Sequence, residues 1–184
     1  PCGIDRVRYI TKYMKTHINI ARFCTASVIM TLSLMAALPA HADFLGKFGD
    51  WEAHARSDSG TKVCYAASVP QKSAGDYTNR GDIFLLVSHR PADKMFGFVS
   101  LEAGYTYDAK SKITAKIGSN SFSMFADGGL AFAYQDKPLV DGMIRGADLI
   151  IQGTSSRGTL TTDTFSLTGF TAAYKAASKA CGVE

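Results

Sequence analysis

The fold is decided by the stretch Asp82-Ile83-Phe84-Leu85-Leu86-Val87-Ser88. Apolar residues occupy both of its alternating sets of positions, and in a strand these two sets face opposite sides of the sheet. A strand of this kind is covered on both faces. The sequence therefore predicts a central strand here, which ends at His89-Arg90-Pro91.

On the N-terminal side of this strand the sequence predicts a hairpin. Residues 49–56 alternate apolar and polar side chains from Trp51 onward, which is typical of a strand with one solvent-facing side. A turn at 57–60 leads into a second strand at 62–69. The polar, glycine-bearing segment 71–81 is expected to be a loop.

On the C-terminal side the sequence predicts more short strands and two helices. The strands are expected at 95–101, 112–117, 121–125, 130–135, 147–154 and 159–165. A short helix is expected at 138–146, and a second helix at 170–181, where apolar residues recur at helical spacing. The predicted fold class is mainly β: an antiparallel β-sandwich or open barrel, with the short helix and with the C-terminal helix packed on the sheet.

The first residues have the pattern of a secretory leader. Basic residues precede an apolar run at 23–38, and Ala40-His41-Ala42 supplies the small residues of a cleavage site. A membrane-spanning helix is the alternative, but the run would rise only about 24 Å against a hydrocarbon core of roughly 30 Å. We expect a signal peptide at 1–42, with 1–13 interpreted as an over-long gene start, and a single β-rich domain at 43–184.

Removing the leader changes the charge and the cysteine count. From Asp43 onward, 15 Lys and Arg residues balance 15 Asp and Glu residues, so the net charge is zero. A neutral domain gives no indication of a nucleic-acid partner or of a basic membrane-binding patch. Only Cys64 and Cys181 remain, and in an oxidising compartment they are expected to form a disulfide. Two free buried thiols are the alternative.

A search for catalytic groups finds few candidates. His54 and His89 are the only histidines after residue 42. The position of His54 on a polar strand face favours a solvated histidine, and that of His89 at the end of an apolar strand favours a structural one. Known nucleophile, phosphate-binding and zinc-protease motifs do not occur. We therefore expect no catalytic residues, metal or cofactor.

One loop is a candidate binding site. Ser155, Ser156, Arg157, Gly158 and Thr159 lie between two predicted strands. Their hydroxyls, backbone N–H groups and guanidinium could hold an anion. The alternative is an ordinary turn with polar residues at its tip.

Two further patterns have mainly structural interpretations. The first is a set of alternating aromatic residues, which strands usually bury, namely Phe96, Phe98, Tyr105 and Tyr107. The second is the adhesion tripeptide Arg80-Gly81-Asp82, which runs directly into the predicted central strand.

Five short motifs in a fixed order resemble the invasion-associated locus B family of small exported proteins from Gram-negative bacteria. They are Phe48-Gly49-Asp50-Trp51, Lys62-Val63-Cys64-Tyr65, the loop 155–159, the stretch 163–170 and Ala180-Cys181. The resemblance implies a β-sandwich-like domain in the periplasm or outer envelope. The resemblance also implies that some members of the family are linked to entry into host cells, and that the family has no established catalytic mechanism.

The sequence favours an exported, non-enzymatic envelope protein that binds an unknown envelope or host protein or another ligand. It is expected in the periplasm, at the outer envelope or secreted, with no membrane span once the leader is cleaved. The alternative is a periplasmic hydrolase or ligand-modifying enzyme with an unrecognised site, which requires a deep pocket with convergent polar groups around Arg157. A surface adhesin is a third interpretation.

Overall fold

The computed structural model describes residues 42–58 and 60–183, so the predicted leader lies outside it except for Ala42. The described part contains eleven strands and two α-helices. The strands are β1 (Ala42–Phe48), β2 (Trp51–Asp58), β3 (Thr61–Ser68), β4 (Lys72–Gly75), β5 (Phe84–Arg90), β6 (Met95–Glu102), β7 (Ile113–Ile117), β8 (Asn120–Asp127), β9 (Leu130–Ala133), β10 (Asp148–Thr154) and β11 (Leu160–Ser166). The helices are α2 (Asp136–Arg145) and α3 (Phe170–Ala180), and a 3₁₀ turn, η1 (Pro91–Asp93), follows β5.

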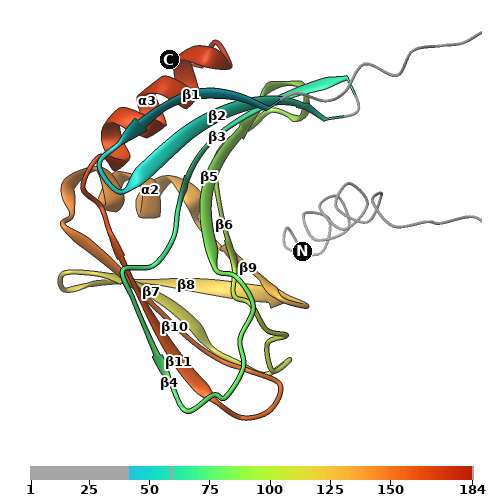
Figure 1. Ribbon diagram of the computed structural model, residues 1–184, viewed down its shortest axis with the longest axis vertical. Helices are drawn as coiled ribbons and strands as arrows, with labels where there is room; N and C mark the ends of the chain where they lie inside the picture. Colours follow the sequence, from blue (N-terminus) through green and yellow to red (C-terminus); the bar gives the residue numbers. More distant parts are fainter. Residues whose placement is uncertain (1–41, 59, 184) are drawn as a thin grey trace, which may run out of the picture. The chain divides into compact units, whose positions relative to one another are not determined.

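All the described strands belong to one antiparallel sheet, in the order β1-β2-β3-β5-β6-β9-β8-β7-β10-β11-β4 (Figure 1). Only residues 69–71 separate β3 from β4, yet β4 pairs with β11 at the far edge of the sheet. This short link brings the two ends of the sheet together. The sheet therefore curls as an open barrel, in which β1 and β4 each have one strand neighbour within the described chain.

Hydrogen bonds join the two ends of the curled sheet. The indole N–H of Trp51 donates to the carbonyl of Ser166 at 2.9 Å, and the Trp51 ring lies edge-on to Phe170 with 4.8 Å between ring centroids. Beside it the backbone N–H of Asp50 donates to the carbonyl of Thr168 at 3.1 Å. Gly169 has φ of 90°, and a Cβ there would collide with the carbonyl of Phe48, so this approach requires glycine.

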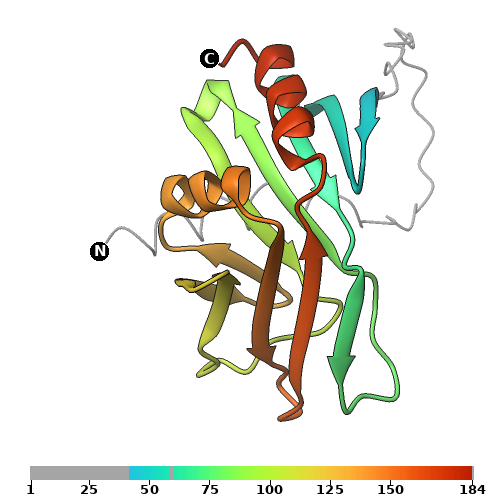
Figure 2. The ribbon, with the colours of Figure 1, turned by 90° about the vertical axis from the view of Figure 1, so that its left-hand side faces the viewer.

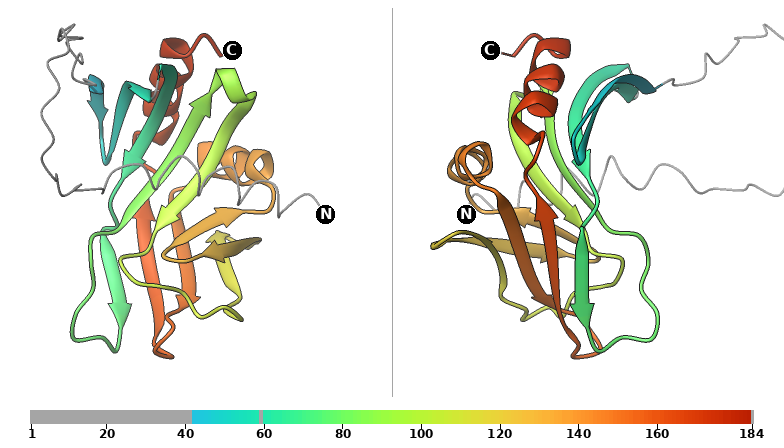
Figure 3. Two further views of the ribbon diagram at one scale, coloured as in Figure 1. Left: turned by 90° about the vertical axis from the view of Figure 1, so that its right-hand side faces the viewer. Right: turned by 60° about the vertical axis from the view of Figure 1, so that its left-hand side comes forward.

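The two helices cover the core on one side. In Figure 2 the helices lie above β10 and β11 and in front of β5 and β6. Figure 3 shows α3 lying beside β5. α3 contacts β1, β2, β3 and β5, whereas α2 contacts β6 and α3. The largest fully buried side chains include Trp51, Phe132, Phe165, Phe170, Leu85, Leu101 and Met143.

A disulfide fastens α3 to the sheet. Cys64 on β3 and Cys181, directly after α3, are bonded across 117 residues with 5.8 Å between their Cα atoms. Cys64 is fully buried beside Ala55 and Ala177. The structure therefore contains the bridge that the sequence predicts.

The mainly β, antiparallel fold with a C-terminal helix on the sheet is confirmed, but one strand was missed and one expected loop was wrong in part. β1 was missed, because a bulge between Phe44 and Gly46 breaks the alternation that marks a strand. The expected loop 71–81 begins with β4, a short edge strand whose sequence has no apolar alternation.

Burial also differs from two expectations. β5 lies between β3 and β6 as predicted, but Phe84 is 39% exposed, so its outer face is only partly covered. Of the alternating aromatic residues, Phe98 and Tyr107 are buried, whereas Phe96 is 51% exposed at the free end of the β5–β6 hairpin.

Reducing the disulfide should lower the free energy of unfolding by about 3–5 kcal/mol, because it releases a long closed loop in the unfolded chain. Urea unfolding of the domain 43–184, followed by the fluorescence of Trp51, measures this with and without reductant. The double variant Cys64→Ser/Cys181→Ser is the control and should be insensitive to reductant. Equal unfolding midpoints for the native domain in both conditions would contradict the prediction.

Candidate functional site

A polar cleft of about 180 Å³ lies where the segment after β4 meets the β10–β11 connection, at the lower end of the sheet in Figure 1. Three segments line it: residues 76–80, the connection from β6 to β7 at Tyr105, and residues 155–161. Its lining residues are Asp76, Tyr77, Thr78, Asn79, Arg80, Tyr105, Ser155, Arg157, Thr159 and Thr161. Three members of the predicted binding loop, Ser155, Arg157 and Thr159, are therefore part of the cleft.

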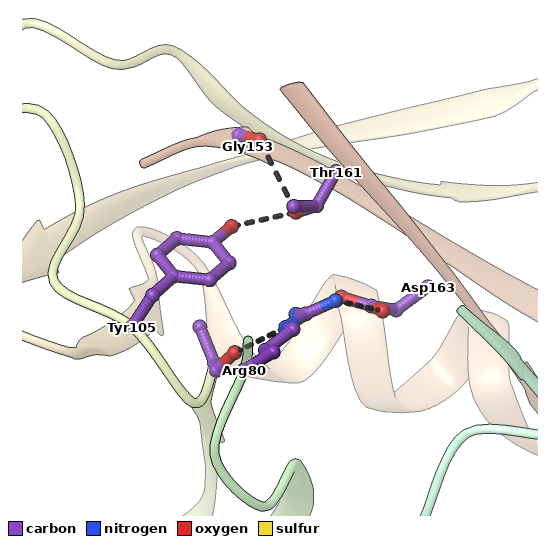
Figure 4. A network of polar contacts seen from close by, with 6 residues as sticks. Arg80, Tyr105, Gly153, Thr161 and Asp163 are labelled. Carbon is purple, nitrogen blue, oxygen red and sulfur yellow. Dashed lines mark hydrogen bonds and ion pairs between the residues drawn. The ribbon is translucent and has the colours of Figure 1, made fainter. Parts of the chain in front are cut away.

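A buried ion pair, which we call the floor, underlies the cleft: Arg80 is one of the lining residues, and its partner Asp163 is not. Arg80 donates to both carboxylate oxygens of Asp163, Nη1 to Oδ1 at 2.8 Å and Nη2 to Oδ2 at 2.7 Å (Figure 4). Its Nε–H donates to the carbonyl of Ala103 at 2.7 Å. The side chains of Arg80 and Asp163 are only 4% and 2% exposed. Burial alone would lower the pKa of Arg80, but the hydrogen bonds and charge of Asp163 raise it overall, so the guanidinium stays charged.

Tyrosine rings enclose the guanidinium of Arg80. Its central carbon lies 5.5 Å from the ring centroid of Tyr77 and 4.9 Å from that of Tyr105. The Thr161 hydroxyl donates to the carbonyl of Gly153, so the Tyr105 hydroxyl, 2.6 Å from Thr161 Oγ1, is the donor to it (Figure 4). Burial raises the pKa of Tyr105, which therefore remains a neutral phenol at physiological pH.

The loop 155–159 forms one wall, and its backbone is held by internal hydrogen bonds. The N–H of Ser155 donates to the carbonyl of Thr159 at 2.9 Å, and the N–H of Gly158 returns to the carbonyl of Ser155 at 2.8 Å. The N–H of Thr159 donates to Ser155 Oγ, and that of Ser156 to the carbonyl of Thr106. These N–H groups cannot serve as the anion cradle that the sequence suggested, so the side chains are what the loop offers to a ligand.

Several lining side chains have hydrogen-bonding capacity to spare. Within the described chain, the side chains of Asp76, Thr78, Asn79 and Arg157 form no hydrogen bond or ion pair with another residue. They comprise a carboxylate, a hydroxyl, an amide and a guanidinium, so the cleft presents both donors and acceptors. The paired Arg80 and Asp163 are thus surrounded by polar side chains that have no partner within the described chain.

The one close serine–histidine contact lies elsewhere and has the wrong polarity for catalysis. Buried His89 accepts the backbone N–H of Gly97 at Nδ1, 3.2 Å away, so the neutral ring carries its proton on Nε2. That N–H donates to Ser178 Oγ at 3.0 Å, and Ser178 in turn donates to the carbonyl of Tyr174. His89 therefore cannot take a proton from Ser178. The pair instead joins α3 to β5, which agrees with the structural role expected for His89.

The remaining sequence candidates are also accounted for. His54 lies on the surface of the sheet, 3.3 Å from the Glu52 carboxylate and stacked on Tyr65. The adhesion tripeptide is not displayed, because Arg80 is buried in its ion pair. Within residues 42–58 and 60–183, no group of three His, Cys, Asp or Glu side chains is placed to hold a metal ion.

The family can be established from comparison with known proteins. Residues 51–178 match the family model described as invasion associated locus B (IalB) protein. The chain belongs to this family. No curated protein and no solved structure matched it. None of the helices in the described part of this IalB chain is long and apolar enough to span a membrane.

Sequence reasoning missed the residues that form the floor of this IalB domain's cleft. Arg80 was noted only as part of a tripeptide, and Asp163 not at all as a site residue. The available signal was parity, because Asp163 shares an inward-facing set of positions on β11 with Thr161 and Phe165. A carboxylate at such a position requires a cationic partner.

Replacing Asp163 by Asn should lower the free energy of unfolding by about 3–5 kcal/mol, because Arg80 would then be charged and buried without its counter-ion. Urea unfolding monitored by Trp51 fluorescence provides the measurement. The matched control is Lys137→Met, which breaks the solvent-exposed Lys137–Asp141 pair and should cost less than about 1 kcal/mol. A comparably small loss for both variants would show that the buried pair is not structurally important.

The stability of the domain should fall on mild acidification because of His89. Burial lowers the pKa of His89 below its ordinary 6.5, so the unfolded chain binds a proton more readily than the folded one. This contribution is complete above about pH 6.5 and declines below it, by at most about 1.4 kcal/mol per pH unit. Unfolding free energies measured between about pH 7.5 and about pH 5.5 should show the decline in the His54→Gln control but not in His89→Gln.

Proposed function

We propose that this IalB-family chain is an exported, non-enzymatic protein of the cell envelope that binds a partner or ligand at the cleft. The single observation that carries the proposal is the contrast within the site. Arg80, Asp163 and Tyr105 are fixed by mutual contacts, whereas Asp76, Asn79 and Arg157 around them keep unused hydrogen-bonding groups. Binding sites combine a pre-formed scaffold with a few available polar groups in this way.

Three observations support export. Residues 1–42 have the pattern of a cleavable leader, and the rest of the chain holds a buried disulfide of the kind that persists in oxidising compartments. Family membership is the third. We accordingly propose cleavage after Ala42 and a working domain at 43–184, located in the periplasm or at the outer envelope.

The proposal of binding rather than catalysis rests on the groups around the cleft. A hydrolase needs a nucleophile within reach of a base, and the described histidines, His54 and His89, are both outside the cleft lining. Asp76 is the one carboxylate in the lining, and Asp163 beneath it is committed to Arg80, so a pair of available carboxylates is lacking there. The cleft also falls below the roughly 300–1,000 Å³ of typical small-molecule pockets, which disfavours the alternative of a deep enzyme site.

The description of the family names invasion, and we propose an envelope or host-cell component as the binding partner. If the chain acts on host cells, the burial of Arg80 means that the contact uses surfaces other than the 80–82 tripeptide. The loop 155–159 and the segment 76–79 are the surfaces that the cleft makes available.

Photo-crosslinking in intact cells tests the proposed site. A photoreactive amino acid at Ser156, beside the cleft, should give a covalent adduct of higher mass in the envelope fraction. The matched control is Ser119, an exposed serine in the β7–β8 turn, and should give none. Mass spectrometry identifies the adduct. Uncoupled monomer from both positions, or identical adducts from both, would count against binding at the cleft.

A further inference from the structure

We propose that the ligand held by the cleft is a saccharide. This inference rests on the proposed function, because it assumes that the cleft is the binding site and adds the chemical class that it recognises. The charge of the lining, its polarity and its hydrogen-bonding groups together disfavour anionic, apolar and peptide ligands.

The formal charges in and under the cleft cancel. Arg80 is neutralised by Asp163 in direct contact, and Arg157 is balanced by Asp76 on the same lining. An anion or a nucleic acid is held by an excess of positive charge, usually together with free backbone N–H groups. The charges give no such excess, and four of the five N–H groups of the loop 155–159 are engaged within the protein. A neutral ligand therefore fits best.

Every residue of the lining carries a polar group, and none of them has an aliphatic or phenylalanine side chain. An apolar ligand would desolvate the carboxylate of Asp76 and the guanidinium of Arg157 without replacing their hydrogen bonds, which costs several kcal/mol. The ligand must instead supply hydrogen-bonding groups at close spacing.

The unused side chains suit adjacent hydroxyl groups. Asp76 only accepts, Arg157 only donates and Asn79 does both, and each has a planar group with two hydrogen-bonding positions. Adjacent hydroxyls on a sugar ring both donate and accept, so they can satisfy all three. The half-buried ring of Tyr77 adds an amphipathic surface against which the C–H face of a sugar can pack.

A peptide is the other neutral, polar ligand to consider. Extended peptides are commonly bound by backbone pairing with a sheet edge. In the 155–159 wall four of the five backbone N–H groups already have partners within the protein, so this wall would contact a ligand mainly through side chains. The small size of the cleft likewise fits one or two ring units better than a peptide segment.

Titration of the domain 43–184 with defined probes tests the inference. The probes are soluble glucose, galactose and N-acetylglucosamine oligosaccharides, with inorganic phosphate and a neutral hexapeptide as the competing classes. Backbone amide NMR signals of 76–80 and 155–159 report binding at the site, and calorimetry gives the affinity. At least one oligosaccharide should shift these signals, whereas phosphate and the peptide should not.

Paired variants assign the contact to individual side chains. Arg157→Ala and Asn79→Ala should each weaken saccharide binding about tenfold or more, because each removes hydrogen bonds to the ligand. The matched controls Arg145→Ala and Asn120→Ala replace exposed residues outside the lining and should leave the affinity unchanged. Thermal unfolding of all four variants verifies that they fold.

The outcomes separate the two proposals. If saccharides leave the signals unmoved while photo-crosslinking from Ser156 still captures a partner, the saccharide inference is wrong and the proposed function stands. If phosphate or the peptide shifts the signals instead, the ligand class is wrong. If neither the probes nor the crosslinking give a result, both proposals fail.

Discussion

The paired hydrogen bonds between Arg80 and Asp163 join two parts of the domain that lie 83 residues apart in the sequence. Asp163 lies on β11, and Arg80 lies in the segment that follows β4, the edge strand paired with β11. Through the carbonyl of Ala103 the same guanidinium reaches the end of β6. Because both charges are buried, removing either one would leave the other unpaired inside the protein. The cleft therefore has a floor of fixed geometry.

Binding sites combine a fixed framework with polar side chains that are free to bond a ligand, and the cleft has both. The floor is held by three hydrogen bonds from the Arg80 guanidinium, two to Asp163 and one to the carbonyl of Ala103. The walls come from the connections after β4 and β10, where sequence can vary without disturbing the sheet.

Much of the fold follows from local patterns in the sequence. Alternation at Trp51, Ala53 and Ala55, and helical spacing from Phe170, report directly which face each element buries. β1 and β4 could not be found in this way, because a bulge disrupts one and backbone pairing alone forms the other. The lining of the cleft was anticipated only in part, through three residues of the loop 155–159. Its floor depends on a contact across 83 residues, which no local pattern encodes.

The bridge between Cys64 and Cys181 has a consequence for biogenesis. Its two sulfurs belong to the third strand and to the residue after the last helix, so the first thiol is made long before its partner exists. Noncovalent pairing must first bring these distant segments into register, and folds dominated by such distant contacts assemble slowly. During that interval Cys64 lacks its native partner and is open to oxidants and folding catalysts. The covalent bond then seals an architecture already found by the strands and the helix.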